Sequence, residues 1–194
     1  MKLCGLTGGV GMGKSTAAGF FLAQGARVID TDELARQLVR PGQPALDEIR
    51  REFGSNVFTA AGELNRAELA RRVFADVGAR KKLEAVLHPR IRAGWLAQVE
   101  LWKQENCPLA VVVIPLLFET QAEAHFQKII CAACSPAAQR ERLAARGWSP
   151  EEISQRRAAQ WPVEQKIARA HHVLWTEGAL SAHEAQVARV WGRI

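Results

Sequence analysis

Short apolar runs alternate with longer amphipathic segments along most of this chain. Runs of strand length lie at 2–7, 27–30, 109–114, 127–134 and 172–175, and the run at 109–114 is apolar throughout. A continuously apolar strand is typical of a parallel sheet whose two faces are both covered by helices. The pattern therefore predicts an α/β fold of three layers, with a five-stranded parallel sheet between helices.

The longest helical stretch separates the second strand from the third. Apolar residues recur there at helical spacing from about 45 to 105, with a break expected at His88-Pro89. A connection of this length is too long for a simple crossover. We interpret it as a helical module that binds a substrate. Further on, Ser149 and Ser181 are expected to cap helices, and Pro162 is expected to divide a basic helical segment.

A complete phosphate loop joins the first strand to the first helix. A G-x-x-x-x-G-K-S motif in this setting cradles phosphate groups with backbone N–H groups and a helix N-terminus. Lys14 is suited to reach the β- and γ-phosphates, and the Ser15 hydroxyl is suited to bind Mg²⁺. The residues expected to surround the nucleotide are Gly8, Gly9, Gly11, Met12, Gly13, Lys14, Ser15 and Thr16.

Asp30 ends the second strand and Asp32 comes just after it, at the carboxyl edge where ligands bind in open α/β sheets. Asp30 can cap the next helix, and it can equally serve as a Mg²⁺ ligand. Asp32 is not needed for capping and is a candidate general base.

Composition narrows the class of ligand. The chain has 194 residues and a formal net charge of +6, but its Lys and Arg residues form no dense tract. This favours a polyanionic small molecule over a nucleic acid. No apolar run is long enough to span a membrane, and Met1-Lys2 leads straight into the first strand, so we expect a cytoplasmic protein. Four cysteines in apolar settings are expected in the core rather than at a metal.

These features indicate a small-molecule kinase. The chain has no guanine-reading motif, and Pro115 follows the third strand where many ATPases carry an aspartate. We expect a single domain, with a core of 1–44, 106–143 and 168–194, an acceptor-binding insertion of about 45–105, and a lid of about 144–167. An arginine-rich lid that closes over ATP would exclude water from the reaction.

The chain resembles the dephospho-CoA kinase family. The resemblance runs nearly end to end, and the following order of motifs is far more selective than the phosphate loop alone: Leu6–Thr16, Val28-Ile29-Asp30-Thr31-Asp32, His88-Pro89, Pro115-Leu116-Leu117-Phe118-Glu119 and Gln139-x-x-Arg142-Leu143-x-x-Arg146. Near the C-terminus the family usually has Ala-Asp before the last strand and Asn after it. Here Ala170-His171 and Thr176-Glu177 stand there, which leaves the mode of base recognition and the nucleotide preference open.

The resemblance implies transfer of the ATP γ-phosphoryl group to the ribose 3′-hydroxyl of dephospho-CoA, with Mg²⁺ and a P-loop kinase fold. It implies that Asp32 orients or deprotonates the hydroxyl and that Arg142 and Arg146 are lid arginines that contact ATP. Residues assigned to the substrate are Thr7, Asp32, Arg66, His88, Leu116 and Leu117, and those assigned to the metal are Ser15 and Asp30.

Several alternatives remain at this stage. His88 can cap a helix, Arg66 and the lid arginines can be solvated, and Leu116 and Leu117 can be plain core. The chain could phosphorylate another nucleotide or a nucleoside monophosphate, or it could be an inactive nucleotide-binding regulator. We expect a monomer or weak homo-oligomer that acts on small molecules.

Overall fold

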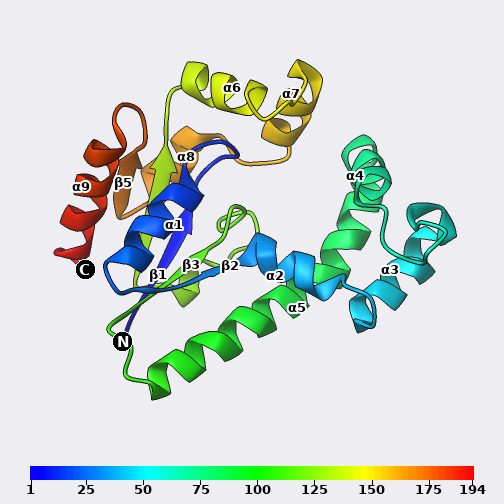
Figure 1. The fold of residues 1–194 in the computed structure, drawn as a ribbon, viewed down its shortest axis with the longest axis horizontal. Helices are drawn as coiled ribbons and strands as arrows, with labels where there is room; N and C mark the ends of the chain where they lie inside the picture. The colour runs from blue at the N-terminus through cyan, green and yellow to red at the C-terminus, as the bar shows by residue number, and fades with distance from the viewer. The chain divides into compact units, whose positions relative to one another are not determined.

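The computed structural model describes all 194 residues and divides them into two compact units. The first unit comprises Met1–Asp30 and Val99–Ile194, and the second comprises Thr31–Gln98. In Figure 1 the first unit contains the sheet and the helices around it, whereas the second unit is helical. No helix has both the length and the apolar character needed to cross a membrane.

The first unit is built on a five-stranded sheet whose pairings are all parallel, as predicted. Its strands lie in the order β2-β3-β1-β4-β5. In the register, Leu6 is level with Val113 of β3 and Ile130 of β4, so the carboxyl ends of the three central strands lie together. The strands are β1 (Lys2–Thr7), β2 (Arg27–Asp30), β3 (Leu109–Val113), β4 (Lys128–Ala133) and β5 (His172–Trp175).

Helices cover one face of this sheet and mixed structure covers the other. Phe21 of α1 (Lys14–Ala23) and Val187 of α9 (Leu180–Trp191) are completely buried with Leu6 in one apolar cluster. Neighbouring strand residues point to opposite faces. Gly5 therefore faces the other side, where the side chains of Leu117 and Phe126 lie directly over it. Later in this unit come the helices α6 (Pro136–Ala144), α7 (Pro150–Ala158) and α8 (Val163–Arg169), of which α8 packs against β4.

The second unit has its own apolar core. Ile49, Val57 and Leu69 are buried in it. Asn65 accepts a hydrogen bond from the Glu68 backbone N–H and so caps its helix. The helices of this unit are α2 (Thr31–Leu38), α3 (Pro44–Phe53), α4 (Arg66–Ala75) and α5 (Val77–Gln104), of which the last continues into the first unit.

Two helix boundaries differ from the prediction. The expected break at His88-Pro89 is wrong, because α5 runs through Pro89 without ending. A proline inside a helix costs about 3 kcal/mol, and burial of Val86 and Trp95 on the same helix offsets this cost. The cap expected at Ser181 is also wrong, since α9 begins at Leu180 after Ala179.

The other local expectations hold. Ser149 forms a capping box with Glu152 at the start of α7, and Pro162 separates α7 from α8. All four cysteines are free and buried, which confirms that they belong to the core. Burial raises the pKa of the Cys4 and Cys131 thiols to about 11.

The backbone passes unusually close to β4 where β1 ends. Gly8 has φ +141°, and a Cβ atom placed on it would lie 2.2 Å from the Ala132 carbonyl oxygen. Both the torsion and the contact exclude a side chain, because the clash is with backbone. Gly19 in the middle of α1 has no such neighbour within 4 Å.

We therefore predict that Gly8→Ala lowers the free energy of unfolding by about 2–3 kcal/mol or more, since it adds backbone strain and a clash. Urea denaturation measures this change. The matched control is Gly19→Ala, which should raise the free energy of unfolding by about 0.5–1 kcal/mol because it lies inside a helix. Wild-type stability of Gly8→Ala would contradict this account of the loop.

Candidate functional site

The phosphate loop connects β1 to α1 and is shaped by glycines. Gly13, the residue before α1, has φ +81°, and the Thr176 side chain lies 3.0 Å from the place a Cβ would take. The loop can therefore lie directly against the segment after β5. Ser15 and Thr16 follow in the first turn of α1 and are exposed. Their backbone N–H groups belong to a helix N-terminus, which favours anions.

Lys14 is folded back over this loop. Its Nζ donates to the carbonyl oxygens of Gly8 and Gly9, both at 2.9 Å. These bonds hold the ammonium group beside the loop backbone. The structure thus places the lysine, the helix N-terminus and the glycine backbone of the motif at one place, at the carboxyl end of β1.

Asp30 and Asp32 lie near the same edge of the sheet. Asp30 ends β2 and is level with Val113, which is in turn level with Leu6 of β1. Adjacent strands are about 4.8 Å apart, so the end of β2 lies about 10 Å from the end of β1. Asp32 is the second residue of α2 and is exposed. Two residues of chain span at most about 7 Å, which keeps Asp32 close to the end of β2.

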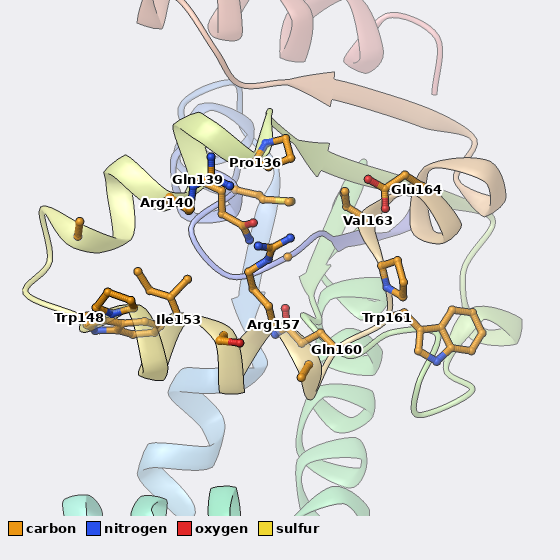
Figure 2. Close-up of a pocket in the computed structure, with 17 residues that line it drawn as sticks. Pro136, Gln139, Arg140, Trp148, Ile153, Arg157, Gln160, Trp161, Val163 and Glu164 are labelled. Carbon is orange, nitrogen blue, oxygen red and sulfur yellow. The ribbon is translucent and has the colours of Figure 1, made fainter.

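A cavity of about 770 Å³ lies between the phosphate loop and the helices α6 and α7. Gly9 and Met12 form its loop side. Figure 2 shows Gln139 on α6 and Arg157 on α7 pointing toward each other into this space, with the rings of Trp148 and Trp161 at opposite ends of it. The cavity therefore combines aromatic walls with cationic and amide groups.

The two predicted lid arginines differ: Thr176 holds the Arg142 side chain by hydrogen bonds, whereas Arg146 is exposed. Arg142 Nη1 donates to the Thr176 hydroxyl at 2.8 Å, and its Nη2 donates to the Thr176 carbonyl at 2.5 Å. The Thr176 hydroxyl in turn donates to the Met12 carbonyl at 3.2 Å. Thr176 thus joins the arginine of α6 to the phosphate loop. Arg146 follows the end of α6 and is solvent-exposed.

The residues assigned to the substrate fall into different surroundings. Thr7 is completely buried, and its hydroxyl donates to the Pro115 carbonyl at 3.2 Å. Leu117 is also completely buried and packs over Gly5, which places it in the core. Leu116 is half-buried.

Arg66 and His88 belong to the second unit. Arg66, the first residue of α4, is exposed and donates to the Arg36 carbonyl at 3.2 Å. His88 lies inside α5 and caps no helix end. Burial lowers the pKa of His88, and nearby Arg92 lowers it further while Glu84 opposes this change. At neutral pH the His88 side chain is therefore neutral and can both donate and accept a hydrogen bond.

No group of three or more His, Cys, Asp or Glu side chains is arranged to hold a metal ion. Cys131 and Cys134 lie on or beside β4, both buried. His171 accepts a hydrogen bond at Nδ1 from the Ile129 backbone N–H. Ser15 and Asp30 carry oxygen groups, which are the kind of donor that Mg²⁺ prefers.

Several residues around the loop were not assigned a role from the sequence. Gln160 and Gln139 bond to the loop backbone, and Arg157 lines the cavity. Lys166 is completely buried and donates to the Pro115 carbonyl. Gln139 belongs to a motif, but the pattern indicates only a helix face. A lysine within an amphipathic helix is usually solvated, so nothing in the sequence distinguished Lys166.

Comparison with known proteins decides the family. The profile described as dephospho-CoA kinase matches residues 2–182. The chain belongs to the dephospho-CoA kinase family. It is 44% identical over 183 residues to the dephospho-CoA kinase of Anaeromyxobacter dehalogenans, covering 94% of this chain and 87% of the relative. It is 45% identical over 189 residues to that of Thiobacillus denitrificans, covering 96% and 92%.

Solved structures support the fold of this dephospho-CoA kinase family member. The crystal structure of TT1252 from Thermus thermophilus is 35% identical, with a TM-score of 0.84 and coverage of 100% of this chain and 97% of that one. A shikimate kinase from Bacteroides thetaiotaomicron, 16% identical with coverage of 99% and 97%, has a TM-score of 0.51 and shares the fold alone. The predicted P-loop kinase fold is confirmed.

Proposed function

We propose that this chain, as a member of the dephospho-CoA kinase family, transfers the γ-phosphoryl group of ATP to the ribose 3′-hydroxyl of dephospho-CoA and releases coenzyme A and ADP. The observation that carries this proposal is the complete phosphate loop, with Lys14 folded over it, at the carboxyl end of β1 in a chain of this family. Phosphoryl transfer has a loose transition state, so positioning and charge do most of the catalysis.

The cations near the loop support binding of ATP. Lys14 would turn its ammonium group from the Gly8 and Gly9 carbonyls to the β- and γ-phosphates. Arg142 on α6 and Arg146, just after this helix, would contact the nucleotide, since guanidinium groups suit the spread charge of phosphates. Arg157 lines the cavity beside the loop and is a further cation near the proposed nucleotide site.

Ser15 and Asp30 would hold the Mg²⁺ ion. Both offer oxygen donors, and neither belongs to a larger cluster of metal-binding side chains. A Mg²⁺ ion in a kinase takes its other ligands from phosphate and water, so this small donor set fits it. Its charge would offset the negative charge of the β- and γ-phosphates.

Asp32 would accept or orient the proton of the acceptor hydroxyl. Its place in the first turn of α2, within about 7 Å of Asp30 along the chain, keeps it near the nucleotide end of the sheet. Arg66, His88 and Leu116 would contact the acceptor. Thr7 and Leu117 would support the acceptor site from the protein interior, because both side chains are buried.

We place the protein in the cytoplasm as a monomer or weak homo-oligomer. Its four free cysteines suit a reducing compartment. The net charge of +6 would attract polyanionic nucleotides, and we expect no binding of nucleic acid.

The acceptor is tested by measuring ADP release with ATP and Mg²⁺ against a panel of acceptors. We predict turnover with dephospho-CoA at least about 100-fold above that with AMP, CMP or adenosine, because a kinase discriminates through contacts to the whole acceptor. Turnover on a nucleoside monophosphate, with none on dephospho-CoA, would replace the proposed acceptor. Nucleotide binding without any transfer would indicate a regulatory protein.

Asp32→Asn should lower kcat with dephospho-CoA by about 100-fold or more, since a positioned base contributes about 10²–10⁴ to the rate. The affinity for ATP should change by less than about threefold. The matched control is Glu33→Gln, which removes the same charge one residue further along α2. Glu33 pairs with Arg36 on the surface, a bond of little energy. Near-normal turnover of Asp32→Asn would remove Asp32 from the chemistry.

A further inference from the structure

Val10, at the crest of the phosphate loop, is bonded on both sides by glutamine side chains. Gln160 Oε1 accepts from the Val10 backbone N–H at 3.0 Å, and Gln139 Nε2 donates to the Val10 carbonyl at 2.7 Å. Gln139 is only 2% exposed, so its bond is shielded from water. The two contacts fix both peptide planes that meet at Val10, which leaves the crest little freedom to rotate.

One glutamine precedes the predicted lid and the other lies within it. Gln139 lies in α6, before the lid segment of about 144–167 begins, and Gln160 lies between α7 and α8. Figure 2 shows the two side chains on either side of the cavity that α6 and α7 form with the loop. Gln160 follows the end of α7 and so joins the lid segment to Val10.

A buried ion pair fixes the backbone next to Gln160. Lys166 is completely buried, and its Nζ donates to Glu119 Oε1 at 2.8 Å and to the Pro115 carbonyl at 2.6 Å. The same Glu119 oxygen accepts from the Trp161 backbone N–H at 2.7 Å. The Trp161 ring stacks on Phe118, with ring centroids 6.0 Å apart. A continuous set of contacts thus runs from the end of β3 to Gln160.

We propose that Gln139 and Gln160 form a clamp that holds the phosphate loop in its nucleotide-binding conformation, and that the Lys166–Glu119 pair positions this clamp. The Val10 N–H is committed to Gln160, so the clamp acts through loop geometry rather than through contact with phosphate. A loop held in its bound conformation loses less entropy when the nucleotide binds. The glutamines are positioning residues. Their proposed effect on affinity rests on the nucleotide site proposed above.

Two variants that add the same charge separate a clamp from simple electrostatics. Gln160→Glu keeps an oxygen that accepts from the Val10 N–H, whereas Gln139→Glu sets a carboxylate against the Val10 carbonyl and reverses that contact. Both place one negative charge beside the loop. Calorimetric titration of the full-length chain with MgADP at pH 8 should show affinity about tenfold or more weaker for Gln139→Glu. A lost hydrogen bond corresponds to about a tenfold effect. For Gln160→Glu, which keeps the oxygen that accepts from the Val10 N–H, the loss should stay below about threefold.

A second readout needs no nucleotide. Hydrogen exchange of the Val10 amide, followed by NMR in the free full-length chain, should be about tenfold faster in Gln160→Ala than in the wild type, since that variant removes the acceptor. Gln160 is only half-buried, so this variant should fold even where a charge at position 139 does not. Gln155→Ala, an exposed glutamine of α7, is the matched control and should leave both readouts unchanged.

Equal losses of MgADP affinity in Gln139→Glu and Gln160→Glu would overturn the clamp and indicate charge alone. Wild-type exchange of the Val10 amide in Gln160→Ala would overturn it independently. Absence of MgADP binding to the wild type would contradict the proposed function, while the exchange measurement would still decide whether the clamp exists.

Discussion

The proposed chemistry depends on one backbone conformation of the phosphate loop. Gly8 and Gly13 permit that conformation, because both have positive φ, and a Cβ would clash with the β4 backbone at Gly8 and crowd the Thr176 side chain at Gly13. Gln139, Gln160 and Thr176 then bond to the loop from α6, from the lid and from the segment after β5. The loop motif occupies a few residues, but its geometry requires contacts that span most of the chain.

Most of the fold was predictable because it follows from local patterns. The apolar run of β3 could only be a strand buried on both faces, and the motif after β1 required a helix to follow. Pro89 was misjudged for a physical reason. A proline disfavours a helix through its own missing N–H, but packing of Val86 and Trp95 along α5 outweighs that local cost. Ser181 was misjudged because a good capping residue can also lie inside the first turn.

A site residue was predictable where a sequence motif specifies its type and position, as with Lys14 in the phosphate loop. It was not predictable where a role comes from a distant contact. Thr176 lies 164 positions from Met12, whose carbonyl it bonds, and nothing in either local sequence indicates that contact. Lys166 belongs to a basic helix and would pass for a solvated residue, yet Glu119 and the Pro115 carbonyl satisfy its charge in the interior. Burial of such a lysine is tolerated only with these partners.

We propose that the loop, Asp32 and the lid together direct the γ-phosphoryl group to one hydroxyl of dephospho-CoA. The most direct measurement follows ATP labelled at the γ-phosphate through one reaction with dephospho-CoA and locates the label in the product by mass-spectrometric fragmentation. We expect to find the label on the ribose 3′-oxygen. Label recovered as inorganic phosphate, or attached to another oxygen of the acceptor, would contradict it.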